Sequence, residues 1–207
     1  MLLLNVPYEE KDEAKALGAR WFPEYKKWAV MSRNDYSKFK KWFKGDIIYC
    51  DHIYLATGTM ECFRCKKNTT VVGIGVDEYM YFQDDFSCYH REAIHIGSYI
   101  EKVFPKELDD FVSKRYKLFY DYSKFMHQSY TANHCCNCGV LQGDFFVFNE
   151  VDSPFVLTTP ESVSDDVVLY KYTLPYDVSG DMTFAYGSND YLFRRYATIK
   201  ELIIPKE

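Results

Sequence analysis

Hydrophobic and polar positions near the N-terminus follow first the period of a strand and then that of a helix. Leu2, Leu4 and Val6 lie at alternate positions, which predicts a short strand that Pro7 ends. Four acidic residues follow closely and fall in the first turn of a helix, where the helix dipole favours negative charge. Gly18 comes after the last apolar position of this helix and is typical of a helix stop.

The next residues predict two more strands and a second helix. Residues 20–22 and 27–30 are rich in β-prone residues and flank the turn 23–26, as in a hairpin. Asn34 suits the N-cap of a helix. The apolar side of this predicted helix carries three aromatic residues, Tyr36, Phe39 and Phe43. We therefore expect residues 1–45, here called the head, to form a β-α-β-β-α module.

Further along the chain, the longest helical pattern runs from Pro105 to about His127. Its apolar positions share one face at helical spacing and are Leu108, Phe111, Val112, Phe119 and Tyr122. We interpret this largely aromatic stripe as core rather than as a binding surface. From about residue 150 the pattern is typical of strands, over 167–174, 183–186 and 191–193.

Together these patterns predict an α+β protein. We expect the head at residues 1–45 and one further domain at 46–207, here called the body. Within the body we expect a helical insertion at about 79–130 and a β-rich C-terminal segment.

Composition places the chain among globular proteins. Of its 207 residues 47% are hydrophobic and 27% are charged, so wholesale disorder is excluded. The 19 Tyr, 16 Phe and 3 Trp make up 18% of the chain, and we assign most of them to packing. Apolar runs fall far short of the roughly 20 residues that a membrane helix needs, and Met1–Leu4 lacks a basic leader. We therefore expect a soluble, cytoplasmic protein.

Charge is distributed unevenly along the chain. The head carries 10 Lys and Arg against 6 Asp and Glu, a net charge of +4, whereas residues 46–207 carry 15 against 24, a net charge of −9. An acidic body argues against a protein that coats nucleic acid over its whole surface. A nucleic-acid contact confined to the head remains open.

The body contains two cysteine pairs with metal-ligand spacing. Cys62 and Cys65 form one C-x-x-C, and Cys135 and Cys138, followed by Gly139, form a second. Four thiolates suit a tetrahedral structural Zn²⁺, and two intervening residues let both sulfurs of a pair reach one ion. The β-prone stretches expected for ribbon hairpins follow, at 69–72, 140–141 and 145–148. The pairs resemble a zinc ribbon with a long insertion.

The separation of the two pairs leaves an alternative open. Between Cys65 and Cys135 lie 69 residues, whereas the usual gap is about 15–20 residues. Closure of so long a loop is feasible because its entropic cost grows only logarithmically with length. Redox-active or unliganded thiols are the alternative to structural zinc.

The remaining cysteines and histidines give weaker signals. His90 and His95 are five positions apart, which places them on different sides of a helix and argues against a joint metal site. His134 or Cys136 is an alternative ligand beside the second pair. Cys50 and His52 are further spare candidates, which we interpret as ordinary residues at a domain boundary. Whether Cys50, Cys88 and Cys136 are reactive depends on their exposure and local charge.

The head resembles a known family. The residues that carry the resemblance are Leu4–Pro7, Glu10–Trp21, Pro23 and Lys27–Trp28. They resemble a small uncharacterised bacterial domain that occurs in TraC-type DNA primases of conjugative plasmids and in other plasmid and phage proteins. The resemblance implies a mobile-element setting and proximity to DNA. It does not imply primase chemistry, because no primase catalytic region is visible in this sequence.

Basic and aromatic residues in the head are candidates for nucleic-acid contacts. They are Arg20, Trp21, Lys26, Lys27, Lys40, Lys41 and Lys44. The cations would meet phosphates and the ring of Trp21 would stack on a base. The alternative is that tryptophans fill the small core while the lysines only solvate a helix face.

Sequence motifs do not indicate an enzyme. We find no nucleophile elbow, phosphate-binding glycine loop or H-E-x-x-H pair. A deaminase needs Glu two positions after its first ligand, where Arg64 stands after Cys62. Four thiolates would also close the coordination shell that a catalytic zinc leaves open.

Two non-enzymatic hypotheses follow. The first is a zinc-binding accessory protein of a plasmid or phage that binds nucleic acid through the head. The second is a protein-binding adaptor or inhibitor in conflict between phage and host, which would use the acidic, Tyr-rich body as an interface.

Overall fold

The computed structural model describes residues 1–83, 86–163 and 165–205, without the side chains of residues 83, 86–88 and 92. Its contacts divide the chain into two compact units. Unit 1 comprises Met1–Asp51, Glu78–Arg91 and Leu174–Met182, and unit 2 comprises His52–Asp77, Glu92–Thr173 and Thr183–Glu207. Each unit therefore draws on segments that are distant in the sequence.

The head has the predicted order of elements. They are β1 (Leu2–Leu4), the 3-10 helix η1 (Tyr8–Glu10), α1 (Lys11–Ala16), β2 (Arg20–Phe22), β3 (Lys27–Val30) and the 3-10 helix η2 (Arg33–Trp42). The strands form an antiparallel sheet in the order β1-β3-β2. Gly18 ends the first helix at a positive φ of 103°, as predicted. The second helix differs from the prediction because it is 3-10 and its N-cap is Ser32 rather than Asn34.

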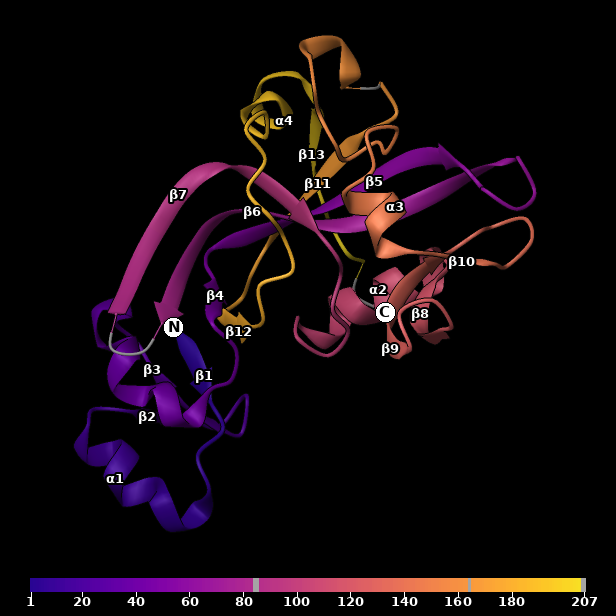
Figure 1. Cartoon of the computed structure of the whole chain (residues 1–207). Helices are drawn as coiled ribbons and strands as arrows, with labels where there is room; N and C mark the ends of the chain where they lie inside the picture. The colour runs from indigo at the N-terminus through magenta and orange to yellow at the C-terminus, as the bar shows by residue number, and fades with distance from the viewer. Residues whose placement is uncertain (84–85, 164, 206–207) are drawn as a thin grey trace. The chain divides into compact units, whose positions relative to one another are not determined.

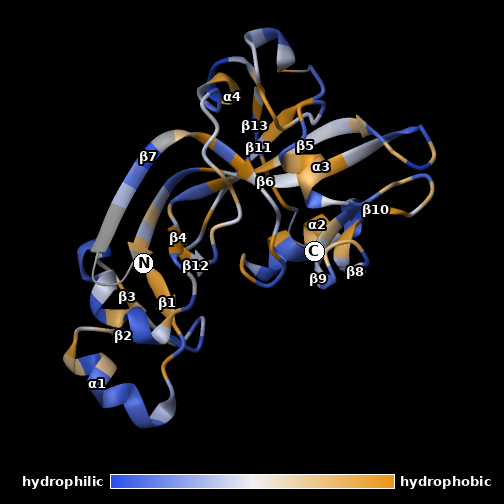
Figure 2. Cartoon of the chain, viewed as in Figure 1, coloured by the Kyte–Doolittle hydropathy of each residue, from blue (hydrophilic) through white to orange (hydrophobic). Residues whose placement is uncertain are grey.

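Later strands and parts of strands complete unit 1. β4 (Ile47–Tyr49) pairs antiparallel with residues 79–81 of β6 (Asn68–Gln83) and with β12 (Val178–Gly180). In Figure 2, β1 and β4 are coloured as hydrophobic, whereas α1 is largely hydrophilic. The core of the unit accordingly combines head residues with residues of the later strands, among them Leu2, Leu4, Tyr36, Phe39, Ile48 and Met80.

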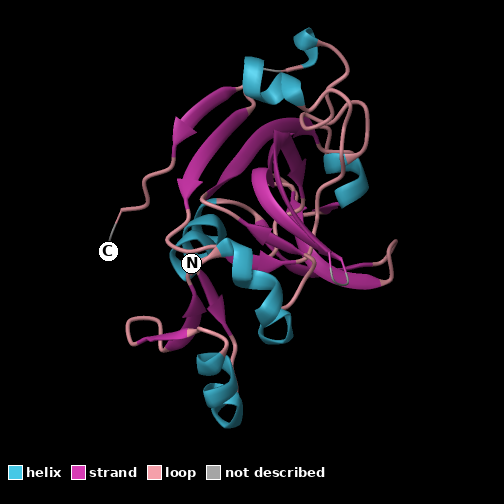
Figure 3. Ribbon diagram, turned by 90° about the vertical axis from the view of Figure 1, so that its left-hand side faces the viewer, coloured by secondary structure: helices cyan, strands magenta, loops and turns pink. Residues whose placement is uncertain are grey.

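Unit 2 is built mainly from strands, and its helices are short (Figure 3). β5 (His52–Glu61) pairs antiparallel with β6 and with β11 (Val168–Thr173), and β11 pairs parallel with β13 (Thr198–Glu201). The long strand β7 (Phe86–Gly97) pairs with β6.

A separate three-stranded sheet in unit 2 has the order β10-β9-β8. Its strands are β8 (Leu118–Ser123), β9 (Gln128–His134) and β10 (Leu141–Gln142). The helices of unit 2 are α2 (Lys106–Arg115), α3 (Asp144–Phe148), the 3-10 helix η3 (Pro160–Ser162) and α4 (Tyr191–Tyr196). The core of the unit includes Tyr54, Val71, Ile94, Leu169 and Phe193.

The α+β class is confirmed, but several predicted elements are wrong. The helix predicted from Pro105 to about His127 ends at Arg115, and the β8–β9 hairpin follows it. The insertion predicted as helical over about 79–130 is therefore mainly strand. Aromatic residues are β-prone, so residues 118–123 form a strand when β9 pairs with them. Helical spacing is ambiguous in so short a segment.

Two stretches predicted as strands are helices instead. Residues 145–148 lie in α3 and residues 191–193 lie in α4. Both are short apolar runs, which periodicity alone does not assign to helix or strand. Residues 183–186 contribute only a bridge between Gly97 and Phe184. Among the described residues, no helix combines the length and the apolar character needed to cross a membrane.

Candidate metal centre

The first cysteine pair occupies the turn between β5 and β6. Cys62 follows directly on β5, and its backbone N–H donates to the carbonyl of Lys67, at 3.0 Å. The N–H of Lys66 in turn donates to the carbonyl of Cys62, at 2.9 Å. Lys66 has a positive φ of 61°, which lets the chain turn back into β6 within a few residues.

The second pair has the same backbone geometry between β9 and β10. The N–H of Cys135 donates to the carbonyl of Val140, and the N–H of Gly139 donates to the carbonyl of Cys135, both at 2.9 Å. Gly139 has a φ of 70° and corresponds to Lys66 in the first turn. The two turns are therefore equivalent knuckles, and Figure 1 shows them side by side.

The four predicted cysteines come together at one point of unit 2. The Sγ atoms of Cys62, Cys65, Cys135 and Cys138 all lie within 4.8 Å of one another. Cys62 and Cys138 are 3.8 Å apart at sulfur, and Cys65 and Cys135 are 3.7 Å apart. Four sulfurs about 2.3 Å from a central Zn²⁺ lie about 3.8 Å apart at the edges of a tetrahedron. The four thiols thus have the spacing of a tetrahedral metal site, well beyond the roughly 2.05 Å of a disulfide.

Backbone donors favour the thiolate in the second knuckle. Burial by itself raises the pKa of Cys135, but two backbone N–H groups donate to its Sγ. They belong to Cys138, at 3.5 Å, and Asn137, at 3.4 Å, and together with the thiols of Cys62 and Cys138 they lower the pKa to about 6. Cys135 is therefore largely a thiolate at neutral pH, the form that binds metal.

The first knuckle divides its donors between its two thiols. Burial raises the pKa of Cys62, but the N–H groups of Cys65 and Arg64 outweigh it and lower the pKa. The N–H of Lys67 lowers the pKa of Cys65, but burial and the neighbouring thiols raise it to about 11. Deprotonation of all four thiols would require a cation to balance their charge, so the arrangement fits a divalent metal.

Polar side chains fix the two knuckles to each other. The buried amide of Asn133 exchanges two hydrogen bonds with the backbone of Val72, at 2.8 and 2.9 Å. The buried hydroxyl of Thr69 accepts from the N–H of Cys136, at 2.9 Å. Gln142 donates to the Sγ of Cys62, at 3.5 Å. Sequence reasoning did not single out these residues, because an isolated polar residue within a strand carries no signal of its partner.

The alternative ligands of the second pair are turned to other contacts. The ring of His134 stacks on Phe119, with centroids 3.8 Å apart, and its Nε2 is 3.1 Å from a carboxylate oxygen of Asp121. Cys136 is exposed, and its Sγ is directed to the carbonyl of Asn68. Neither belongs to the four-sulfur cluster.

The remaining candidate ligands are engaged elsewhere or lie outside the described side chains. His52 lies 2.9 Å from the buried carboxylate of Asp77. His90 stacks on Tyr79. His95 lies 2.6 Å from a carboxylate oxygen of Asp190. Cys50 is buried in unit 1, where burial raises the pKa of its thiol far above the ordinary value, whereas the side chain of Cys88 is outside the described set.

Within the head, all candidate cations except Lys40 are exposed, and some of them are also held by neighbouring groups. Arg20 and Lys26 are exposed on β2 and in the β2–β3 turn, and Lys44 is exposed after η2. Trp21 is 50% exposed and packs edge-on against Trp28, with centroids 5.9 Å apart. These side chains are accessible to a ligand.

Three other candidate lysines have partners within the head. Lys41 contacts both carboxylate oxygens of Glu13, at 2.7 and 2.8 Å. Lys40 donates to the carbonyl of Gly45. Lys27 donates to the side chain of Asn5, at 2.8 Å. Their charge is thus partly used to hold the head together.

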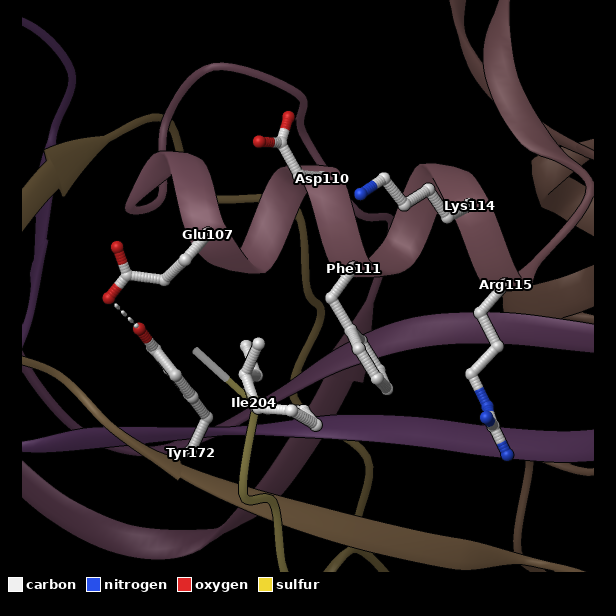
Figure 4. A pocket seen from close by; sticks show the side chains of 8 residues that line it. Glu107, Asp110, Phe111, Lys114, Arg115, Tyr172 and Ile204 are labelled. Carbon is white, nitrogen blue, oxygen red and sulfur yellow. Dashed lines mark hydrogen bonds between the residues drawn. The ribbon is translucent and has the colours of Figure 1, made fainter. Parts of the chain in front are cut away.

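An open pocket of about 720 Å³ lies beside α2 in unit 2. Glu107, Phe111 and Arg115 follow one another at intervals of four residues along one side of the helix, with Tyr172 and Ile204 opposite them (Figure 4). The hydroxyl of Tyr172 donates to Glu107, at 2.9 Å, and the guanidinium of Arg115 lies over the ring of Phe111. The predicted apolar stripe included Phe111 as core, but this ring lines the pocket.

Comparisons with known proteins identify the head. Residues 1–44 match a domain of unknown function, DUF5710. Two Escherichia coli proteins named DNA primase TraC are similar to this part of the chain, one 52% identical over 42 residues and the other 54% identical over 39 residues. The predicted resemblance of the head is thereby confirmed.

These similarities are confined to a small part of each protein. The aligned segments cover 20% and 19% of this chain but only 3% and 4% of the two primases. No solved structure is significantly similar to the chain.

Proposed function

We propose that this protein is a non-enzymatic accessory protein of a plasmid or phage, which binds nucleic acid through its head and holds a structural Zn²⁺ in its body. The observation that carries the proposal is the accessible set of cations and one indole in the head, in a domain similar to a segment of DNA primases. Thiolate ligands persist in a reducing compartment, so we place the protein in the cytoplasm.

Arg20, Lys26 and Lys44 are the proposed main phosphate contacts, because they are exposed cations that take no part in the contacts described above for Lys27, Lys40 and Lys41. Trp21 supplies a half-exposed ring on which a base can stack. Lys27 uses one of its three N–H donors for the hydrogen bond to Asn5. We propose that another donates to a phosphate. Lys40 and Lys41 contribute mainly through the net charge of the head.

The Zn²⁺ in this proposal has a structural role. Its four ligands would be Cys62, Cys65, Cys135 and Cys138, which fill a tetrahedral shell and leave no position for substrate. The ion would join the β5–β6 turn to the β9–β10 turn, so its binding free energy would stabilise unit 2.

Fluorescence anisotropy of labelled duplex DNA across a salt series tests the head. We expect the affinity to fall steeply with salt, because binding releases counterions from the phosphates. The variant Arg20→Glu/Lys26→Glu/Lys44→Glu should bind at least about tenfold more weakly and lose about 2 to 3 units of the salt slope.

The matched control reverses three exposed cations of unit 2, in Lys106→Glu/Arg195→Glu/Lys200→Glu. It changes the net charge equally and should retain most of the affinity. If both variants bound DNA equally weakly, the net charge of the protein and not the surface of the head would explain binding. An absence of binding by the wild-type protein at low salt would refute the proposal.

A further inference from the structure

The β8–β9 hairpin of unit 2 exposes an unusual number of large apolar side chains. Tyr120 is 65% exposed, Tyr122 is 51% exposed, and Phe125 at the tip is 87% exposed. Met126 and Phe119 are also exposed. Phe119 stacks on His134 and belongs to one face of β8, whereas Tyr120 and Tyr122 belong to the other. Large exposed apolar side chains gathered on one face are typical of a site of interaction in soluble proteins.

The register of the hairpin leaves two of these rings uncovered on one face. Tyr120 lies opposite Thr131, and Tyr122 lies opposite Ser129, so only small hydroxyl side chains stand beside the rings. Residues two apart on a strand share a face and are about 6.7 Å apart. This spacing suits successive bases of an extended single strand, each stacked on one ring.

The stretch of sequence that contains the hairpin is opposite in charge to the rest of the body. Residues 111–140 contain four basic residues, Lys114, Arg115, Lys117 and Lys124, against one acidic residue, Asp121. The local net charge is thus +3 within a body of net charge −9. Asp121 alternates with Tyr120 and Tyr122 along β8, so it belongs to the other face, where it contacts His134. The Tyr120 face is therefore free of carboxylates from its own two strands.

We propose that this face of the β8–β9 hairpin is a second nucleic-acid site, specific for single strands, in which Tyr120 and Tyr122 stack on bases. Lys124, which follows β8, contacts the phosphates, and Phe125 extends the stacking surface at the tip. Duplex DNA does not bind here, because its bases are stacked on one another and present no free face. The site does not depend on binding by the head.

Three probes of equal length separate stacking from charge: single-stranded oligothymidylate, an abasic oligonucleotide and a DNA duplex. The full-length wild-type protein should bind oligothymidylate at least about tenfold more tightly than the abasic strand, because the abasic strand keeps the phosphates but has no bases. The variant Tyr120→Ala/Tyr122→Ala should lose this preference and bind the duplex as wild type does.

Two further variants control for folding and for aromatic content. Tyr120→Phe/Tyr122→Phe keeps both rings and should bind oligothymidylate within about twofold of wild type, since stacking needs only the ring. Tyr191→Ala/Tyr196→Ala removes two exposed tyrosines of α4 and should have no effect. Unchanged zinc content and melting temperature would show that all variants are folded.

The head and the hairpin can fail separately. All three tryptophans lie in the head, so quenching of tryptophan fluorescence reports on binding there. Equal affinity of wild type and Tyr120→Ala/Tyr122→Ala for oligothymidylate would overturn the hairpin proposal, whatever the head binds. The hairpin proposal would also be overturned if the wild-type protein bound the abasic strand as tightly as oligothymidylate. The same holds if the hairpin bound a protein and not oligothymidylate.

Discussion

Single residues in this protein matter through the neighbours that the fold gives them. The two metal knuckles have the same backbone path, yet Gly139 stands in one at the position that Lys66 occupies in the other. Glycine accepts a positive φ without cost, whereas an L-residue is strained there by about 1 kcal/mol. The two backbone hydrogen bonds of the first turn, between Lys66 and Cys62 and between Cys62 and Lys67, hold Lys66 in this conformation.

Asp144 is a partly buried acid whose negative charge is unfavourable in the folded chain. Burial raises its pKa to about 6, and the hydrogen bond from Ser98 offsets this only in part. Between about pH 4 and 6 the folded chain therefore keeps a proton that the unfolded chain has lost, and the free energy of unfolding falls as the pH rises. Asp144→Asn should raise the free energy of unfolding by about 2 to 3 kcal/mol at pH 7 and hardly change it at pH 4.

Urea unfolding of both proteins at the two pH values measures this difference. Asp152→Asn, at an exposed position, is the control and should change nothing at either pH. A gain in stability of the same size at pH 4 and pH 7 would show that the carboxylate charge is not its cause.

At the scale of elements, turns were predicted better than the type of the segments between them. Both cysteine pairs lie in hairpin turns, as their local spacing indicated. Residues 116–123 were assigned to a helix, because Phe119 and Tyr122 continue the spacing of Leu108 and Phe111. The same residues are β-prone and form a strand when β9 pairs with them. The local sequence does not show which segment will pair with them.

The two hairpin turns depend on each other through the metal. Cys62→Ser/Cys138→Ser removes one ligand from each knuckle and should abolish zinc binding. It should also lower the melting temperature by about 10 °C or more, because metal binding is coupled to folding and each kcal/mol is worth about 2–4 °C in a domain of this size. Metal analysis and circular dichroism measure the two effects.

Cys136→Ser is the matched control, since this exposed cysteine lies inside the second pair without joining the sulfur cluster. It should keep one zinc per chain and the wild-type melting temperature. Zinc retained in Cys62→Ser/Cys138→Ser, or lost in Cys136→Ser, would show that the ligands are assigned wrongly.

At the scale of the whole molecule, unit 1 is assembled from three separate parts of the sequence. Asp177, from the last of these parts, accepts two hydrogen bonds from Arg33, both at 2.8 Å, and one from the hydroxyl of Tyr36, at 2.7 Å. Its side chain is only 4% exposed. The head residues are thus anchored to a strand far along the chain, and the boundary expected at residue 45 stays a prediction.

Asp177→Ala should destabilise unit 1 by about 3 kcal/mol, because it leaves the buried hydroxyl of Tyr36 without its acceptor and removes the buried partner of Arg33. Asp51→Ala removes the half-exposed partner of the same Arg33 and should cost less than about 1 kcal/mol. Tryptophan fluorescence during urea unfolding monitors both variants, since all three tryptophans belong to unit 1. Equal losses in the two variants would contradict the role assigned to burial.

The sequence by itself determined what depends on neighbouring residues. The order of elements in the head follows from local signals: alternating apolar positions in β1, acidic residues at the first helical turn and Gly18 at the end of the helix. The two C-x-x-C knuckles follow from spacing in the same way, and their four cysteines lie close together in the structure.

Only the tertiary structure decided what depends on distant residues. Strand pairing brings Cys65 to Cys135 across 70 positions, and it turned a predicted helix into the β8–β9 hairpin. Side-chain contacts are likewise a property of the fold: Lys41 is exposed but is paired with Glu13, and Tyr120 is 65% exposed on a strand that the sequence pattern had assigned to a helix. A local pattern encodes propensity, but contacts and burial arise from segments that meet only when the chain is folded.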